Sequence, residues 1–284
     1  MALREADRAM ATTMERPEIP PINPKRGGTA PWPVTFYRSA VGKKWVMAVT
    51  GIMVMGFVFF HAVGNLKVYL GAEALNHYAE FLQQLLVPIL PPTIALWIMR
   101  GGLLVAIVFH IHSAYGLTRM NHRANGSGYE QRRHYQAANA ASRSMRWTGI
   151  VVGLFILFHL ADLTFGTLNP DFVRDDVYRN LVASLSRPPV ALIYIIANIG
   201  LGIHLFHGSW SMFQSLGLNN PRWNSWRKGF AIGFAGLVMV INVSFPIAVL
   251  TGVVSATNNP DCRVDPDSSV IVDCTQYESQ EATP

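Results

Sequence analysis

Five long apolar segments constrain the fold of this chain more than any other feature of its sequence. They cover Trp45–Gly64, Ile94–Leu117, Trp147–Phe165, Val190–Phe213 and Gly229–Val254. A helix crosses a bilayer with about 20 apolar residues, so each segment is long enough to span a membrane. Only 14% of the 284 residues are charged, whereas soluble domains have about a quarter. The sequence therefore predicts an all-α membrane protein, a bundle of five transmembrane helices.

The segments outside the spans divide the chain into three parts. We expect a tail over residues 1–42, a membrane domain over residues 43–254 and a second tail over residues 255–284. Residues 1–36 contain six prolines and no periodicity, so we expect neither helix nor strand there, and we identify no cleaved signal peptide. Between the first two spans, residues 72–86 place apolar side chains on one helical face, which is typical of a helix lying on the membrane surface.

The basic residues outside the spans predict the orientation of the chain. Seventeen Lys and Arg lie on the side of the N-terminus and five lie on the other side. Cytoplasmic loops of membrane proteins carry an excess of positive charge, so we expect a cytoplasmic N-terminus and an exterior C-terminus. This topology also accounts for the net charge of +6 without a nucleic-acid partner.

Histidines within the spans are the main candidates for function, because ionisable side chains are costly in a bilayer and usually functional. His61 and His159 lie toward the outer ends of the first and third spans. His110 and His204 lie at matching depth in the inner halves of the second and fourth spans. Two pairs of imidazoles at two depths suit two haems that each have two histidine ligands.

Other polar residues accompany these pairs. His112 lies about 200° around the helix from His110, so the two cannot face one ligand. His207 shares a face with His204 and is interpreted as a second ligand or as a contact to a haem propionate, a quinone or a helix. Arg100 either pairs with a propionate or reaches the membrane surface. We interpret Asp162 as an interfacial acid rather than a proton-handling group.

The residues alone leave three other interpretations open. In the first, the chain is a purely structural anchor whose histidines hydrogen-bond between helices. In the second, the chain is a transporter whose histidines relay protons. Inverted repeats are typical of transporters, and none is apparent in this sequence. A Rieske-type 2Fe–2S centre uses two histidines and two cysteines, and His61, His159, Cys262 and Cys274 are all predicted on the outer side. A disulfide between the two cysteines is the simpler interpretation.

Motifs in each of the first four spans resemble those of one family. They are Lys44-Trp-Val-Met-Ala-Val-Thr-Gly51 with His61-Ala-Val-Gly-Asn-Leu-Lys67, Asn76-His-Tyr-Ala79, His110-Ile-His-Ser-Ala-Tyr-Gly-Leu-Thr118 with Asn121, Ser142-Arg-Ser-Met145 with Phe158-His-Leu160, and Gly202-Ile-His-Leu-Phe-His-Gly208 with Ser211 and Gln214-Ser-Leu-Gly-Leu-Asn219. In this order they resemble the five-helix cytochrome b membrane-anchor subunit of succinate dehydrogenase/fumarate reductase, or respiratory complex II. The resemblance covers residues 43–254.

This resemblance implies an anchor in the bacterial plasma (inner) membrane with a flavoprotein subunit and an iron–sulfur subunit docked on its cytoplasmic face. The flavoprotein oxidises succinate, a step of the tricarboxylic acid cycle, and electrons pass through the iron–sulfur subunit and this chain to membrane quinone. In the family, axial ligands of haem b fall at the positions of His61, His110, His159 and His204. His110 then pairs with His204, and His61 pairs with His159.

The resemblance also directs attention to the inner face. Six arginines between the second and third spans are a candidate docking surface for the soluble electron donor: Arg119, Arg123, Arg132, Arg133, Arg143 and Arg146. Ser39 and Trp45 are candidate contacts for quinone, which needs an apolar slot with one or two hydrogen-bonding groups. A homo-oligomer of the whole complex is compatible with these features.

Overall fold

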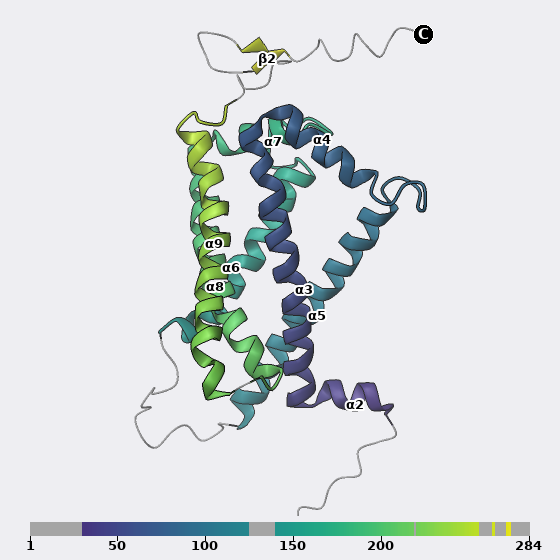
Figure 1. Ribbon diagram of the computed structural model, residues 1–284, viewed down its shortest axis with the longest axis vertical. Helices are drawn as coiled ribbons and strands as arrows, with labels where there is room; N and C mark the ends of the chain where they lie inside the picture. Colours follow the sequence, from purple (N-terminus) through teal and green to yellow (C-terminus); the bar gives the residue numbers. More distant parts are fainter. Residues whose placement is uncertain (1–29, 125–139, 219, 256–262, 265–270, 274–284) are drawn as a thin grey trace, which may run out of the picture.

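The five predicted spans are continuous helices in the computed structural model of the chain (Figure 1). The structure describes residues 30–124, 140–218, 220–255, 263–264 and 271–273. The long helices are α3 (Ala40–Asn65), α5 (Ile94–Ala124), α6 (Ala140–His159), α8 (Pro188–Ser215) and α9 (Asn224–Leu250). All five are long and apolar enough to cross a membrane, which confirms the predicted all-α bundle.

Helix α8 is the centre of the bundle. It packs against α9, α6 and α3, whereas α5 packs mainly against α3. Figure 1 shows α5 beside α3 near the end of the bundle that carries α2 and diverging from it toward the other end. A small apolar core of Leu205, Ala235 and Val238 joins α8 to α9 and contacts Phe59 of α3.

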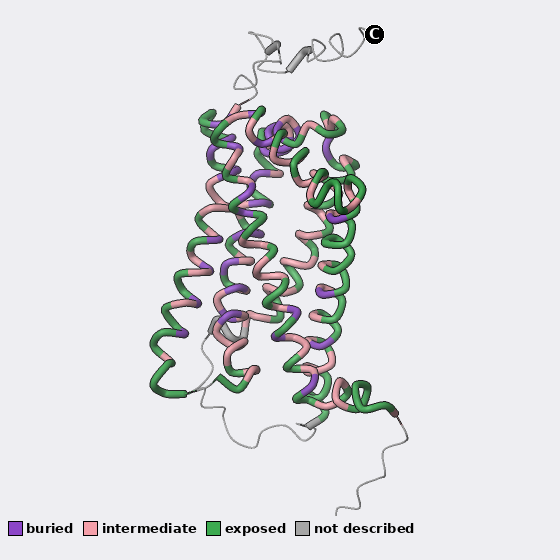
Figure 2. The backbone as a smooth tube through the Cα atoms, turned by 45° about the vertical axis from the view of Figure 1, so that its right-hand side comes forward, coloured by how far each residue is buried: buried purple, intermediate pink, exposed green. Residues whose placement is uncertain are grey.

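Most apolar side chains of the spans point away from the bundle. Leu104, Leu154 and Val240 are each more than 60% exposed, although they lie near the middle of their helices. Figure 2 shows exposed positions along the whole length of the long helices, with buried positions scattered between them and many at the end that holds α4 and α7. Lipid tails are as apolar as these side chains, so such faces are expected of helices that span a bilayer.

Two short helices cover one end of the bundle, which we call the capped end. Helix α4 (Ala72–Gln83) confirms the predicted helix between the first two spans but ends three residues earlier than expected, and the turn η1 (Leu66–Leu70) connects it to α3. Helix α7 (Val177–Leu185) was not predicted. Asp176 caps α7 by accepting a hydrogen bond from the backbone N–H of Arg179, and Asn76 of α4 donates to the same carboxylate.

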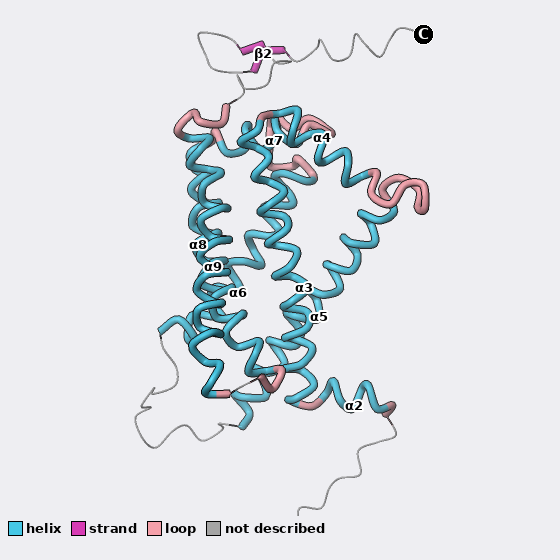
Figure 3. The backbone as a smooth tube through the Cα atoms, in the orientation of Figure 1, coloured by secondary structure: helices cyan, strands magenta, loops and turns pink. Residues whose placement is uncertain are grey.

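The opposite end carries α2 (Trp32–Arg38), and here the expectation of no helix before residue 37 is wrong. Pro33 lies in the first turn of α2, where a helix needs no N–H donor from the residue and proline is tolerated. The remaining elements are short. Figure 3 shows almost all of the described backbone as helix or loop, with one small strand pair near the C-terminus. That pair, β1 (Arg263–Val264) and β2 (Ile271–Asp273), is antiparallel.

Candidate functional site

His110 on α5 is held by one turn of α3. Its Nδ1 atom lies 3.2 Å from the carbonyl oxygen of Met47 and 3.4 Å from Oγ1 of Thr50. Gly51 lies next to the ring, because a Cβ atom there would be 3.4 Å from Cε1 of His110. A proton on Nδ1 donated to Met47 leaves the lone pair of Nε2 available to a metal.

His204 on α8 is held by one turn of α6 in the same way. Its Nδ1 atom lies 3.4 Å from Oγ1 of Thr148, and the ring hydrogen-bonds to the backbone of Met145. A Cβ atom at Gly149 would lie 3.4 Å from Cε1 of His204. His110 and His204 are close enough to interact electrostatically. The structure therefore brings together the two histidines predicted as the inner pair.

These two matching supports arise from an internal repeat. Residues 47–61 and 145–159 are identical at eight of fifteen positions, and both segments begin with Met-x-x-Thr-Gly-Ile and end with Phe-His. The sequence analysis identified the histidines and missed the Met-x-x-Thr-Gly turns that support the opposite pair. Comparison of the first and third spans with each other would have found these turns.

His61 and His159 also lie together, at the capped end of α3 and α6. Their ring centroids are 5.9 Å apart and the ring planes are 85° from parallel. Each histidine packs against the phenylalanine four residues before it, Phe57 at 5.3 Å and Phe155 at 5.9 Å between ring centroids. The phenylalanines occupy equivalent positions of the repeat, so the outer pair is supported as symmetrically as the inner pair.

Asp162 is a buried ion-pair partner, which corrects its interpretation as an interfacial acid. It lies on the π-turn η2 (Leu160–Thr164) that continues α6 beyond His159, and its side chain is 0% exposed. Arg187 donates to Oδ1 of Asp162 at 2.7 Å, and Ser184 donates to Oδ2. A charge buried at this depth is tolerated because it is paired and hydrogen-bonded.

Tyr194 connects this carboxylate to the outer histidine pair. Its hydroxyl donates to Oδ2 of Asp162 at 2.9 Å and lies 3.4 Å from Nδ1 of His159. The Tyr194 side chain is itself buried, and its ring packs edge-on against Phe155. A chain of hydrogen bonds therefore runs from Arg187, which is 30% exposed, to the imidazole of His159.

The two remaining span histidines lie in different environments. His112 is exposed and faces α2, where its Nδ1 atom hydrogen-bonds to the Tyr37 hydroxyl and its ring stacks on the Tyr37 ring. His112 is thus directed away from the inner pair, as its angular separation from His110 predicted. His207 is buried beside Phe206, and its Nε2 atom has no hydrogen-bond partner.

The predicted quinone contacts lie at the end that carries α2. The Ser39 hydroxyl caps α3, because it accepts from the N–H of Gly42 and donates to the carbonyl of Phe36. Trp45 is 44% exposed on the outer surface of α3. Cys262 and Cys274 lie outside the described residues.

The arginines of the predicted docking surface are only partly described. Arg119 and Arg123 are exposed near the end of α5, and Arg146 of α6 lies 3.4 Å from the ring of His122. Arg132 and Arg133 are outside the described residues. Arg100, near the other end of α5, lies over the ring of Trp97 at 5.1 Å, an arrangement that suits the membrane interface.

The four paired imidazoles form a donor set that fits haem iron with two axial histidines. The described residues contain no group of three or more His, Cys, Asp or Glu arranged around one metal position. In the outer pair, the ring centroids of His61 and His159 lie 5.9 Å apart, near enough for both imidazoles to hold one iron. In the inner pair, the contacts at Nδ1 leave Nε2 for the iron.

Comparison with known proteins supports the family resemblance. The family described as succinate dehydrogenase/fumarate reductase transmembrane subunit matches residues 120–243. The matched region runs from the end of α5 into α9 and contains His159 and His204, one histidine from each pair. No curated protein and no solved structure matches the chain. The family match confirms the resemblance that the sequence motifs indicated.

Proposed function

We propose that this chain is a multi-pass membrane anchor of the succinate dehydrogenase/fumarate reductase type and that it passes electrons from an iron–sulfur subunit to membrane quinone. The observation that carries this proposal is the pairing of four histidines at two depths. One pair lies at the capped end of the bundle, and the other is held by two equivalent turns deeper in it. Electron carriers placed in this way divide the width of a membrane into short steps.

Haem b is the cofactor that the two pairs would hold. His61 and His159 would hold the outer haem, and His110 and His204 would hold the inner haem. Bound there, haem b supplies a centre that takes up and releases one electron at a time.

The contribution of the protein itself is to fix the imidazoles. The carbonyl of Met47 orients the His110 ring through Nδ1, and the His204 ring hydrogen-bonds to the backbone of Met145. Such contacts are how proteins select the nitrogen that binds a metal. Phe57 and Phe155 pack against the outer rings and shield them from water. The chain of hydrogen bonds through Tyr194 holds His159 from its far side.

We propose an orientation in which residues 1–42 form a cytoplasmic tail, residues 43–254 cross the membrane and residues 255–284 lie outside. The excess of Lys and Arg on the side of the N-terminus supports it. Exposed Arg119 and Arg123 then face the cytoplasm, where the iron–sulfur subunit docks and joins the anchor to the flavoprotein that oxidises succinate. The proposed location is the plasma membrane of a bacterial cell.

The optical spectrum tests the cofactor assignment. We expect the chain, purified with its partner subunits, to give a dithionite-reduced minus oxidised spectrum with the sharp bands of low-spin haem b. Labile sulfide in excess of that in the iron–sulfur subunit, in place of these bands, would favour the Rieske-type centre. A preparation with no haem and no iron beyond that of the iron–sulfur subunit would refute the electron-transfer proposal.

Substitution of one inner ligand tests the assignment of residues. The change His204→Ala should remove one of two haem signals and slow quinone reduction by succinate. His112→Ala is the matched control, because His112 lies on the neighbouring helix but faces α2. Equal spectra for the two variants would contradict the assignment of His204.

A reporter fusion tests the orientation. Alkaline phosphatase fused after residue 255 should be active in an intact bacterial cell, because that enzyme folds outside the cytoplasm. A fusion after residue 218, between α8 and α9, should be inactive. The reverse pattern would show that the proposed orientation is inverted.

A further inference from the structure

A cavity between α8 and α9 that opens at the surface is lined in part by His207, which carries a buried ring nitrogen with no hydrogen-bond partner. The cavity measures about 270 Å³ and is lined by Gly202, Ile203, Phe206, His207, Ile232, Ala235, Gly236 and Met239. His207 is only 5% exposed, and its Nε2 atom makes no hydrogen bond. Leaving a buried polar atom unpaired costs free energy, so this nitrogen in an apolar wall indicates a ligand with a complementary polar atom.

The depth of the cavity restricts which ligands reach it. His207 is eight residues before the end of α8, which is about 12 Å along the helix axis. The cavity residues of α9 begin eight residues after the start of that helix, again about 12 Å from its end. The site therefore lies within the hydrocarbon layer, where the charged head group of a phospholipid is not stable.

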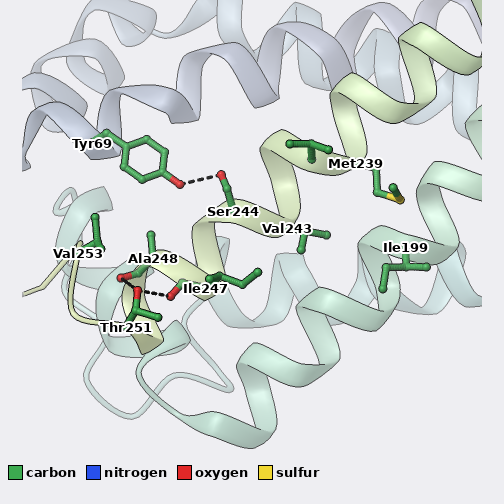
Figure 4. Close-up of a pocket in the computed structure, with 10 residues that line it drawn as sticks. Tyr69, Ile199, Met239, Val243, Ser244, Ile247, Ala248, Thr251 and Val253 are labelled. Atoms are coloured by element: carbon green, nitrogen blue, oxygen red, sulfur yellow. Dashed lines mark hydrogen bonds between the residues drawn. The ribbon is translucent and has the colours of Figure 1, made fainter.

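A second apolar groove continues from this cavity toward the capped end. It measures about 570 Å³, and both spaces share Met239. Figure 4 shows Met239 and Thr251 at opposite ends of this groove and the Tyr69 hydroxyl directed at Ser244. Tyr69 donates to Ser244 at 2.7 Å, so these two polar groups satisfy each other. His207 is the polar atom in the two spaces that is left to bind a ligand.

We propose that the His207 cavity binds the ring of a membrane quinone and that the adjoining groove receives its isoprenoid tail. The Nε2–H of His207 donates a hydrogen bond to a ring carbonyl oxygen. A ligand with one polar end and a long apolar tail matches one unpaired nitrogen followed by an apolar groove. His207 is one helical turn from His204, so the ring lies near the inner histidine pair. This inference rests on the proposed function and adds a location for quinone.

Three substitutions separate the cavity from its surroundings. His207→Leu removes the nitrogen and keeps an apolar side chain of similar size. Gly236→Leu fills the cavity, because no atom lies within 4 Å of a Cβ atom at this glycine and the backbone need not move. Gly233→Leu is the matched control, since Gly233 is on the same helix, has the same free space, and lines neither the cavity nor the groove.

Binding is measured on the full complex in lipid nanodiscs, by quenching of tryptophan fluorescence with decyl-ubiquinone and with the tailless ubiquinone ring. We expect His207→Leu and Gly236→Leu to weaken the binding of decyl-ubiquinone at least tenfold, about the effect of one lost hydrogen bond. Gly233→Leu should bind like the original protein. The tailless ring should bind more weakly than decyl-ubiquinone to the original protein, because it does not fill the groove.

Unchanged binding in both His207→Leu and Gly236→Leu would overturn the proposed site. Equal weakening by Gly233→Leu and Gly236→Leu would overturn it too, because any bulky residue on α9 would then have the same effect. Equal affinities for the tailed and tailless quinones would refute the role of the groove. The reduced minus oxidised spectrum of the same samples distinguishes these results from failure of the proposed function, since haem bands with unchanged binding reject the cavity alone.

Discussion

The buried ion pair between Asp162 and Arg187 gives a sharp test of how the capped end is stabilised. The Asp162 side chain is 0% exposed and that of Arg187 is 30% exposed, with 2.7 Å between Nη2 and Oδ1. Arg187→Gln removes the positive charge and leaves the carboxylate buried. The remaining donors to Asp162 are the hydroxyls of Ser184 and Tyr194, which carry no charge.

The expected cost follows from this geometry. Removing one partner of a fully buried ion pair costs about 3–5 kcal/mol. We expect the lower end of that range, about 3 kcal/mol, because Arg187 is partly exposed and two hydroxyls still donate to the carboxylate. For a chain of this size, that loss lowers the melting temperature by roughly 6–12 °C.

Whether a second substitution raises or lowers the stability of Arg187→Gln is more informative than how much stability Arg187→Gln itself loses. Asp162→Asn removes the buried negative charge, so adding it to Arg187→Gln should recover about 1–3 kcal/mol. The double variant is therefore expected to be more stable than Arg187→Gln alone. Thermal unfolding in detergent, followed by circular dichroism, measures all three proteins under one set of conditions.

Arg174→Gln is the control for loss of a positive charge at the same end of the bundle. Arg174 is exposed, and its replacement should change stability by less than about 0.5 kcal/mol. The reasoning fails if Arg187→Gln is no more harmful than Arg174→Gln. It also fails if the double variant is less stable than Arg187→Gln, because the carboxylate would then be stabilised without its partner.

Three further predictions concern close packing around the histidines and beneath the cap. Gly51→Leu and Gly149→Leu should displace the inner rings and abolish one haem signal. Gly56→Leu and Gly153→Leu place the new side chain in open space, so they should retain both signals. Loss of signal in all four variants would contradict this prediction. Thr148→Val should keep the inner haem signal but shift its midpoint potential in a redox titration, because a hydroxyl next to Nδ1 of His204 is lost. An unchanged midpoint potential would show that this contact is unimportant. Gly64→Ala should lower the free energy of unfolding by about 1–3 kcal/mol, because its Cβ atom would lie 2.7 Å from the Tyr78 ring. In the same thermal unfolding experiment, Gly101→Ala should be neutral or stabilising, because no atom lies within 4 Å of its Cβ atom.

The sequence was most informative where membrane physics leaves few alternatives. A span needs about 20 apolar residues and a satisfied backbone, so composition alone located all five long helices. Short helices such as α2 and α7 depend on local caps and on docking to other elements. Asp176 caps α7 and is itself bonded by Asn76, a residue 100 positions earlier, and no local pattern indicates that contact.

The same distinction applies to polar groups within the bundle. Histidines in a span indicate function by themselves, because ionisable side chains are costly in a bilayer. The direction of each helix was enough to assign them to two depths. Asp162 was misjudged because its partners follow it by 22, 25 and 32 residues, and only the fold brings Ser184, Arg187 and Tyr194 to one carboxylate. The unpaired nitrogen of His207 likewise depends on how α9 packs against α8.

The internal repeat explains why both histidine pairs have similar supports. Helices α3 and α6 carry the repeat and run in the same direction, and each contributes a Met-x-x-Thr-Gly turn to the inner pair and a terminal histidine to the outer pair. One sequence motif thus defines two depths, because its ends are fourteen residues apart, about 21 Å along a helix. The distance between the two histidine pairs is therefore set within each helix and not by loops. A substitution that tilts α3 or α6 should move one histidine of the outer pair together with the support of one inner histidine. The two pairs are consequently coupled in structure even though they share no histidine.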